Sequence, residues 1–418
     1  MEIKINSVRD LDLAGKRVLF RPDINATIDR ETRKIISDTR LRANAETLKY
    51  MLDQGAKVAI IAHQGDALDY ENLQPLEEHA EKLSEFTGYR VTYIDDVCGP
   101  AALAAVMALR EGEAVILGNL RYLGEELSTF DSYVRLTAER MRDVWHIRKL
   151  APLFDVYVND AFSAAHRRAP SMVGFQQFMP SAAGFQFFTE YEVLTRVLHG
   201  AEHPSMFVLG GAKISDAFGM MEPVLKNGTA DKLLITGVTG VVMHLAKGKT
   251  FGEKQMKFLK EKNLLPFVDV AKEYLAAYPD AFELPLDFAY EKDGERVEVS
   301  ADEEMPDAIL MDVGEKTVAH YRELLLTAKT IFANGPAGVY ENPVFENGTK
   351  GIWQAIADSD GYSVMGGGDT GTSAKKFIDM SKISYMCTAG GAMVNFMSGK
   401  RLPLVEAMEE AYDPSLKK

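Results

Sequence analysis

Hydrophobic positions in the first half of the chain come in short, nearly continuous runs. Segments between them, such as 40 to 55 and 76 to 88, have the apolar spacing of amphipathic helices instead. Continuous runs are typical of strands buried on both faces of a parallel sheet. The alternation of strand and helix therefore predicts an α/β fold with a doubly wound parallel sheet. The four runs are KRVLFRPDIN (16 to 25), KVAIIAHQG (57 to 65), AVILGNLR (114 to 121) and VYVNDAF (156 to 162).

In the second half, five apolar runs of strand length lead directly into glycine-rich turns. Glycine permits positive φ and close backbone approach, so such a turn lets main-chain N–H groups converge on an anion. Ligands of open α/β sheets bind at the carboxyl ends of the strands. Five such turns predict a nucleotide-sized phosphate site along a second parallel sheet. They are MFVLGGAK (206 to 213), KLLITGVTG (232 to 240), TIFANGPAG (330 to 338), YSVMGGGDT (362 to 370) and YMCTAGGA (385 to 392).

The two halves are expected to form separate domains. A chain of 418 residues with 46% hydrophobic content favours two cores of roughly 200 residues each. No Pro/Gly/Ser-rich linker separates the halves, and residues 181 to 200 have the pattern of a long helix. We therefore expect a helix to join the domains, with the boundary near residue 185.

Composition narrows the choice of partners. A formal net charge of -14 argues against nucleic acid or an anionic membrane as the main partner. Cys98 and Cys387 are the only cysteines, which excludes a disulfide framework and fits a reducing compartment. The N-terminus lacks the apolar region of a signal peptide, and no apolar run approaches the roughly 20 residues needed to span a bilayer. A cytoplasmic protein is expected.

Polar side chains that suit an anionic ligand lie just beyond the first-half strands. These strand ends meet at one edge of a sheet, so the side chains are expected to converge. A guanidinium fork matches carboxylate and phosphate oxygens with paired charge-assisted bonds, which predicts a small, multiply anionic ligand. The residues are Arg21, Asp23, Asn25, His63, Asn119, Arg121, Asn159, Asp160, His166 and Arg167, with Arg40 at the start of a helix.

Two charged residues follow the second-half glycines. Lys213 comes after GGA and is suited to neutralise a transferred phosphoryl group, and Asp369 comes after GGG and is suited to nucleotide-bound Mg²⁺. The pattern GxxxxGK[ST] does not occur, and GxGxxG is not found at a strand end, which excludes two common nucleotide-binding folds. A nucleotide half facing an anion half across a cleft predicts a phosphotransferase that closes to exclude water.

Ordered segments across nearly the whole chain resemble phosphoglycerate kinases. They are RPDIN, ISDTRLR, AHQG, NLRY, VYVNDAFSAAHR, LGGAKISD, LPLD, ANGPAGVYEN, MGGGDT and TAGGA, and the stretch 160 to 175 is similar to the archaeal branch. The resemblance implies two Rossmann-like domains joined by a long helix, 1 to 185 and 186 to 392, with a tail, 393 to 418, that returns to the first. It also implies ATP or ADP and an anionic carboxylate as substrates, Mg²⁺ as cofactor, and a monomer or weak homodimer.

The resemblance assigns roles residue by residue. It implies direct in-line transfer without a covalent intermediate, with Arg40, Lys213, Gly367 and Gly390 at the catalytic centre. The acid substrate is assigned to Asp23, Asn25, Arg40, His63, Arg121 and Arg167. The nucleotide is assigned to Gly211, Ala212, Lys213, Gly237, Asn334, Pro336, Gly338, Val339, Glu341, Gly368, Asp369 and Thr370, with Asp369 as the ligand of nucleotide-bound Mg²⁺.

Three positions depart from the family pattern. Asp66 occupies the place of an arginine that helps clamp the substrate's 3-phosphate. At about 4 Å and an effective dielectric near 20, a unit charge pair is worth roughly 4 kcal/mol, so the reversal weakens affinity unless Asp66 points away or Arg168 compensates. Gly118 replaces a glutamate near Arg121. Ala389 interrupts a triple glycine, and either crowds the passing phosphoryl group or adjusts helix packing.

Three hypotheses follow. The first is a phosphoglycerate kinase with a rearranged Asp66 loop. The second is a related carboxylate kinase that acts on a different acid, one with no phosphate or with a cationic group that pairs with Asp66. The third is a nucleotide-binding regulatory protein with weak catalysis. The kinase residues, Lys213 and Asp369 among them, favour either kinase over the third hypothesis, and Asp66 favours the second over the first.

Overall fold

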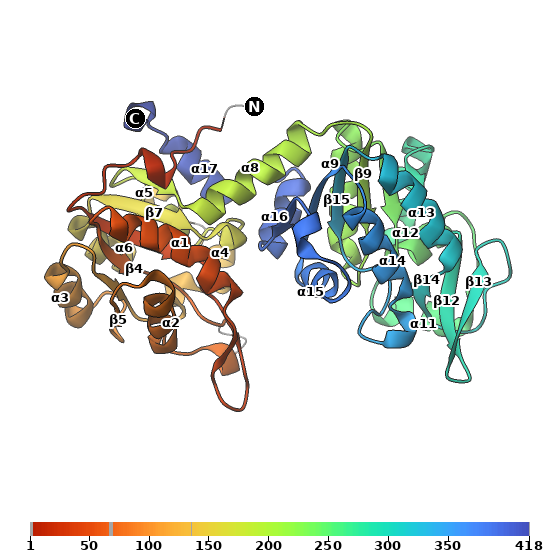
Figure 1. Ribbon diagram of the computed structural model, residues 1–418, viewed down its shortest axis with the longest axis horizontal. Helices are drawn as coiled ribbons and strands as arrows, with labels where there is room; N and C mark the ends of the chain where they lie inside the picture. Colours follow the sequence, from red (N-terminus) through yellow and green to blue (C-terminus); the bar gives the residue numbers. More distant parts are fainter. Residues whose placement is uncertain (1–2, 67–69, 135, 418) are drawn as a thin grey trace. The chain divides into compact units, whose positions relative to one another are not determined.

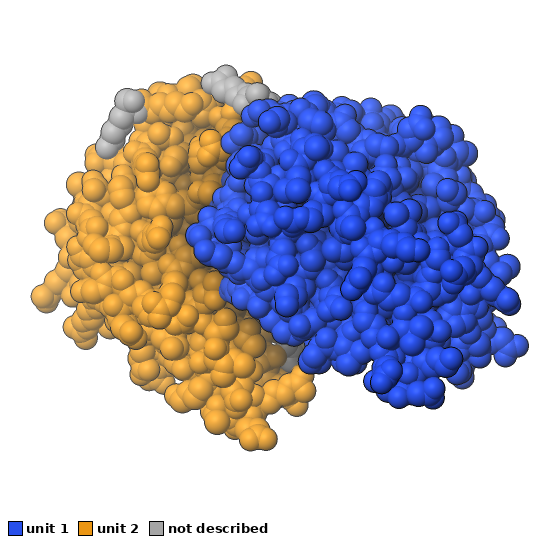
Figure 2. Space-filling view, turned by 45° about the vertical axis from the view of Figure 1, so that its right-hand side comes forward, with its two compact units in different colours: residues 1, 193–400 blue, residues 2–192, 401–418 orange. Residues whose placement is uncertain are grey.

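The computed structural model describes residues 3–66, 70–134 and 136–417, and its chain forms two compact units. The N-terminal unit consists of residues 2–192 and 401–418, and the C-terminal unit of residues 193–400 (Figures 1 and 2). Each unit is built on a six-stranded parallel sheet, as the two sets of apolar runs predict.

The sheet of the N-terminal unit has the strand order β5-β6-β4-β1-β7-β8. Along β1, Val18 and Phe20 pack with helices α1 and α2, whereas Leu19 packs on the other face with α3 and α6. Both faces are therefore covered, which explains the continuous apolar runs. The strands are β1 (Arg17–Pro22), β4 (Lys57–Ile60), β5 (Val91–Tyr93), β6 (Ala114–Ile116), β7 (Val156–Asp160) and β8 (Ser181–Ala183), with a small antiparallel pair, β2 (Thr27–Ile28) and β3 (Ile35–Ser37).

Helices of this unit lie between successive strands, except for the last. They are α1 (Thr39–Asp53), α2 (Glu77–Thr87), α3 (Pro100–Ala108), α4 (Ser128–Tyr133), α5 (Ala138–Met141), α6 (Trp145–Leu150), α7 (Pro170–Val173) and α17 (Pro403–Glu410).

The sheet of the C-terminal unit has the order β11-β10-β9-β15-β16-β17. Four of the five glycine-rich turns open a helix as expected, at the starts of α9, α10, α15 and α16. The strands are β9 (Ser205–Leu209), β10 (Lys232–Ile235), β11 (Phe282–Glu283), β15 (Thr330–Asn334), β16 (Tyr362–Gly366) and β17 (Tyr385–Cys387). The helices are α9 (Ile214–Lys226), α10 (Gly237–Ala246), α11 (Glu253–Glu261), α12 (Phe267–Ala277), α13 (Glu315–Thr327), α14 (Asn347–Ala357), α15 (Gly368–Phe377) and α16 (Gly390–Met397).

A three-stranded antiparallel sheet is added to this unit. It consists of β12 (Asp287–Lys292), β13 (Glu295–Ser300) and β14 (Leu310–Val313) in the order β13-β12-β14. Asp293 and Gly294 join the first two strands with φ of 54° and 83°, the positive values that a two-residue type I′ hairpin turn requires. This sheet matters for the site because β12 and β14 carry residues that line a pocket.

The observed division differs from the expected domain limits in two places. The long helix α8 (Phe185–His199) forms where the sequence predicts it, but the units divide within it, after Glu192, instead of near residue 185. The returning segment begins at Arg401 instead of residue 393, because α16 packs against α9 of the C-terminal unit. Among the described residues, none of the helices combines the length and apolarity needed to cross a bilayer.

Candidate active site

The carboxyl ends of the N-terminal sheet bring four basic side chains together around a narrow pocket. Arg21 is the penultimate residue of β1, His63 follows β4, Arg121 lies in a 3₁₀ turn after β6, and Arg167 follows β7. Arg21 Nη2 donates to His63 Nδ1 across 2.8 Å. A guanidinium has only donors, so Nδ1 is the accepting nitrogen and His63 is neutral.

Burial and mutual repulsion lower the pKa values of Arg21, His63 and Arg121 in this cluster. Burial, and then the charges of four surrounding arginines, hold the pKa of His63 well below its ordinary value. Burial also lowers the pKa of Arg21 and of Arg121. The Nε of Arg121 is buried and has no hydrogen-bond partner among the described residues. An unsatisfied buried donor inside a ring of cations is suited to an oxyanion.

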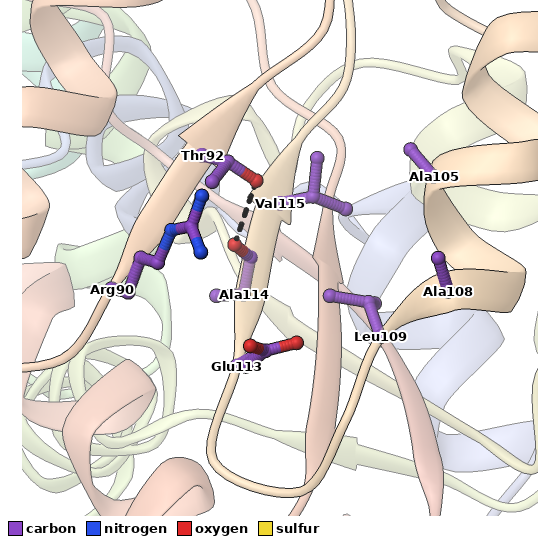
Figure 3. A pocket seen from close by; sticks show the side chains of 8 residues that line it. All are labelled: Arg90, Thr92, Ala105, Ala108, Leu109, Glu113, Ala114 and Val115. Atoms are coloured by element: carbon purple, nitrogen blue, oxygen red, sulfur yellow. Dashed lines mark hydrogen bonds between the residues drawn. The ribbon is translucent and has the colours of Figure 1, made fainter.

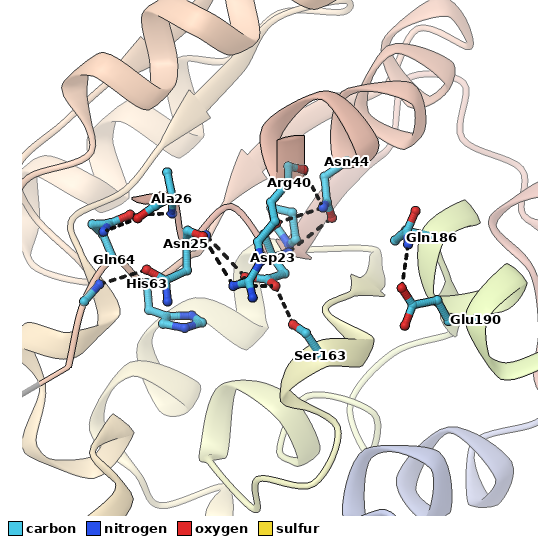
Figure 4. A network of polar contacts seen from close by, with 12 residues as sticks. Asp23, Asn25, Ala26, Arg40, Asn44, His63, Gln64, Ser163, Gln186 and Glu190 are labelled. Carbon is cyan, nitrogen blue, oxygen red and sulfur yellow. Dashed lines mark hydrogen bonds and ion pairs between the residues drawn. The ribbon is translucent and has the colours of Figure 1, made fainter. Parts of the chain in front are cut away.

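The other predicted acid-site residues form a polar network beside this pocket (Figure 4). Arg40, in the first turn of α1, places Nη1 3.2 Å from Asp23 Oδ2 and donates to the carbonyl of Asn25 across 3.3 Å. Asn25 Oδ1 accepts from the Gly65 N–H, and Ser163 Oγ donates to Asp23. The Arg40 side chain is 38% exposed, so its guanidinium is accessible to a ligand.

The C-terminal unit has a pocket of about 280 Å³ at the carboxyl ends of its strands. Its apolar side chains come from α10, β12, β14 and the loop after β15 and form a surface suited to a flat base, whereas Asp312, Glu341 and Asp369 supply carboxylates. It is lined by Gly211, Ala212, Gly237, Val238, Val241, Phe288, Leu310, Met311, Asp312, Pro336, Ala337, Gly338, Val339, Tyr340, Glu341 and Asp369.

Two glycine-rich loops pack against each other beside this pocket. The Gly210 N–H donates to Asn334 O and the Gly211 N–H to Pro336 O. Gly335 has φ of 89°, and a Cβ there would lie 2.2 Å from Gly210 O. We expected these N–H groups to face a phosphate. The glycines instead permit close contact between the two loops, and the Gly210 and Gly211 N–H groups are already used in that contact.

Several residues assigned to the nucleotide lie outside the pocket lining. Asn334 and Thr370 are buried and brace the loops, because Asn334 Nδ2 donates to Gly366 O and Thr370 Oγ1 accepts from the Gly335 N–H. Lys213 is exposed at the start of α9. Gly368 of the nucleotide set lies at the start of α15, as does Gly367 of the predicted catalytic centre, and Gly390 of that centre lies at the start of α16. Cβ atoms built on Gly368 and Gly390 would meet nothing within 4 Å.

Comparison with known proteins identifies the family of this chain. The family model described as phosphoglycerate kinase matches residues 8–400. The chain belongs to the phosphoglycerate kinase family. It is 39% identical over 408 residues to the phosphoglycerate kinase of Methanothermus fervidus, covering 98% of each chain, and 40% identical over 407 residues to that of Methanococcus maripaludis, covering 97% and 98%. A crystal structure of phosphoglycerate kinase from Pyrococcus horikoshii OT3 matches with a TM-score of 0.88 and 38% identity, over 98% of this chain and 99% of that one.

These matches confirm the predicted family, the α/β fold class and the class of reaction. The chain is a phosphotransferase with a carboxyl acceptor, of the class to which phosphoglycerate kinases belong. Family membership also makes a nucleotide one of its substrates.

Asp66 is the departure from the phosphoglycerate kinase pattern that bears on the acid. Its Oδ2 lies 3.7 Å from Arg121 Nη2, and its side chain is 35% exposed. The carboxylate therefore faces the pocket arginine instead of turning away from it. Arg168 does not compensate, because it is exposed, donates to Leu136 O and does not line the pocket.

The other two departures fit the local packing. Ala389 is fully buried before α16 and has φ of -92°, an ordinary value for a residue with a side chain. This favours the helix-packing explanation over crowding of the phosphoryl path. A Cβ on Gly118 would lie 3.1 Å from the backbone of Asp96, so a glutamate at this position would require the neighbouring turn to shift.

Asp369 is the residue through which the chain would hold Mg²⁺. It is exposed in the first turn of α15 and lines the nucleotide pocket. The described residues include no group of three or more His, Cys, Asp or Glu side chains that would bind a metal by themselves. An exposed carboxylate at the start of a helix beside the nucleotide pocket fits Mg²⁺, which keeps several waters and binds mainly through nucleotide phosphates.

The sequence reasoning missed carboxylates that act on the site. Glu126 lines the acid pocket, and Asp131 Oδ2 accepts from Arg167 Nε across 2.6 Å. Burial raises the pKa of Asp312, which lies in the nucleotide pocket, to about 6. Glu126 lies in a GEEL stretch typical of an exposed turn, so no signal marked it. Asp312 lies within an apolar run, ILMDVG (309 to 314), that forms an antiparallel strand, so the strand-end rule for parallel sheets does not find it.

A cavity of about 220 Å³ lies elsewhere in the N-terminal unit (Figure 3). It is formed by α3 and by the first residues of β5 and β6, so it lies at the opposite sheet edge from the acid pocket. Among the described residues that line it, Arg90 and Glu113 are charged, and the rest are mainly alanine, leucine and valine. It offers no convergent set of charges.

Proposed function

We propose that the acid substrate is 3-phosphoglycerate, bound in the arginine pocket of the N-terminal unit, and that ATP or ADP binds in the pocket of the C-terminal unit. The observation that carries this assignment is the buried, unpaired Nε of Arg121 within a cluster of three arginines. Such a site favours a ligand with several negatively charged oxygens, and a phosphorylated carboxylic acid has them.

In this proposal the substrate carboxylate attacks the γ-phosphorus of ATP in line. A bond forms between the carboxylate oxygen and phosphorus as the bond to the ADP oxygen breaks, and the reverse reaction produces ATP. No general base is needed, because the carboxylate is already ionised. Arg40 at the acid side and Lys213 at the nucleotide side neutralise charge on the phosphoryl group. When bound through Asp369, Mg²⁺ supplies further charge neutralisation at the nucleotide phosphates.

A different acid is the second candidate, and the contact between Asp66 and Arg121 is the observation that favours it. A carboxylate in this position suits an acid that lacks a phosphate or carries a cationic group. The family assignment, together with Lys213 and Asp369, favours either kinase over a regulatory protein.

Initial rates with MgATP and 3-phosphoglycerate, measured beside a panel of other small carboxylic acids, separate these candidates. We expect saturable turnover of 3-phosphoglycerate and little with the panel. Preferential use of a panel acid would establish the second candidate instead.

A further inference from the structure

Glu126 lines the acid pocket, and the proposed phosphoryl transfer does not involve its side chain. It ends the 3₁₀ turn Gly124–Glu126, which directly follows the turn that carries Arg121. Only 3% of the residue is exposed, although it lines the pocket. An acidic side chain is almost never this buried unless other groups pair with it.

The carboxylate of Glu126 is fully engaged. Its Oε1 accepts from the Ser171 N–H across 2.7 Å and its Oε2 from Ser171 Oγ across 2.6 Å. His146 Nε2 lies 2.9 Å from Oε1. Burial alone raises the pKa of Glu126, but His146, the Ser171 hydroxyl and the charge of Arg21 together lower it to about 2. Glu126 is therefore a fixed negative charge beneath the cations of the pocket.

The same residue contacts two pocket arginines through its main chain. Its carbonyl oxygen accepts from Arg121 Nη1 and, across 3.4 Å, from Arg167 Nη2. A third arginine is reached through Ser171, whose hydroxyl accepts from Arg21 Nε across 3.3 Å. One buried residue thus connects to all three guanidinium groups that line the pocket.

The energetic reason for such an arrangement is mutual repulsion. Three guanidinium groups around one pocket disfavour each other, and the charge of Arg167 opposes the protonated forms of Arg21 and Arg121. The charge of Glu126 favours the protonated form of both. A buried counter-charge with bonded neighbours therefore keeps the pocket formed before an anion arrives, and a preformed site avoids the cost of ordering its side chains on binding.

We propose that Glu126 is a positioning residue for the acid site. Its carbonyl oxygen holds Arg121 and Arg167, and its carboxylate holds Arg21 through Ser171. The inference rests on the proposal that the acid binds in this pocket. In this role Glu126 does not contact the substrate itself, and its substitution should affect the binding of the acid but not of the nucleotide.

Glu126→Gln keeps the carbonyl and the side-chain shape but removes the charge. Replacing the counter-charge of Arg21 and Arg121 by a neutral amide, which also accepts more weakly from Ser171, predicts a rise of about tenfold or more in KM for 3-phosphoglycerate, with KM for ATP within about twofold of the parent. Ser171→Ala removes the hydroxyl that joins Glu126 Oε2 to Arg21 Nε and keeps the Ser171 N–H bond to Oε1, so it should give a smaller rise of the same kind. The matched control is Glu125→Gln, in the same turn but partly exposed, which should leave both KM values unchanged.

Inorganic phosphate, titrated calorimetrically against the parent and the three variants, gives a readout that does not depend on turnover. Weaker phosphate binding by Glu126→Gln and Ser171→Ala, but not by Glu125→Gln, supports the inference even if the parent proves inactive with 3-phosphoglycerate. If Glu126→Gln fails to fold, Ser171→Ala decides the matter. Parent-like acid KM and phosphate binding in a folded variant, or an equal loss for acid and nucleotide, would overturn it.

Discussion

Asp66 and Arg121 face each other at the rim of the acid pocket, with 3.7 Å between Oδ2 and Nη2. The arginine is nearly buried and the aspartate is about one-third exposed. An anionic substrate must therefore share this guanidinium with a carboxylate of the protein itself. The pair lies near solvent, so its strength is reduced to about 1 kcal/mol, in place of the several kcal/mol of a fully buried contact.

Neutralising Asp66 should improve the use of 3-phosphoglycerate. We expect Asp66→Asn to lower its KM several-fold and Asp66→Arg to lower it further, because each step removes repulsion or adds attraction. The gain should shrink as salt is added, since screening weakens exposed charges. Steady-state kinetics at low and high ionic strength measure this. Asp53→Asn, which removes an exposed pair with Lys49, is the control. A higher or unchanged KM for 3-phosphoglycerate in both Asp66 variants would show that Asp66 does not repel the substrate.

Gly335, which lies in one of the packed glycine loops, can be compared with Gly248, which has the same φ but no close neighbours. Both have φ of 89°, but a Cβ on Gly335 would lie 2.2 Å from Gly210 O, whereas one on Gly248 would meet nothing within 4 Å. Gly335→Ala should weaken ATP binding at least tenfold and lower Tm clearly, because the two loops must separate. Gly248→Ala should cost only about 1 kcal/mol in strain. Calorimetric titration with ATP and thermal unfolding give both quantities, and similar effects of the two substitutions would argue against loop contact as the function of Gly335.

Lys213 should affect turnover and leave the fold intact. Its side chain is exposed at the start of α9, so Lys213→Ala should keep the parental Tm. Loss of its charge from the nucleotide side should lower kcat by about 100-fold or more, as removal of a single electrostatic stabiliser does in other enzymes. Lys226→Ala, in the last turn of the same helix, provides the control. A parental kcat for the Lys213 variant would exclude it from the reaction.

Asp160 should make the parent less stable as pH rises. Burial raises its pKa to about 6, and it accepts from Thr47 Oγ1 and from the Phe187 N–H. The folded state then holds a proton that the unfolded state has lost between about pH 4 and pH 6. Stability therefore falls across that window, by up to about 3 kcal/mol.

Asp160→Asn removes this term, so the variant should gain in Tm relative to the parent between pH 4.5 and pH 7. Asp312 has a pKa of about 6 as well and leaves a residual slope of the same sign in both proteins. Thermal unfolding of parent and variant at the two pH values tests this, and a difference in Tm that does not change with pH contradicts it.

The strand ends and glycine turns were predictable because their signals are local. An apolar run followed by Arg21 or by Gly211 indicates a strand, the turn after it and its place at the carboxyl edge of the sheet, all within about ten residues of sequence. Glu126 gave no such signal, because its importance depends on Ser171, which lies 45 positions away in the chain. Nothing in the sequence signals the use of the glycine N–H groups either, because their hydrogen-bond acceptors lie in another loop. Asn334 matched a binding motif, but its partner Gly366 is brought beside it only by strand pairing.

Phosphorylation of 3-phosphoglycerate is the activity that we propose for this chain, and initial-rate kinetics of the unmodified protein measure it. With MgATP and 3-phosphoglycerate, ADP production should be saturable in both substrates and should require Mg²⁺. The same assay with other small carboxylic acids should give little or no rate. No turnover of 3-phosphoglycerate, together with saturable turnover of another acid, would contradict the claim and assign the arginine pocket to a different substrate.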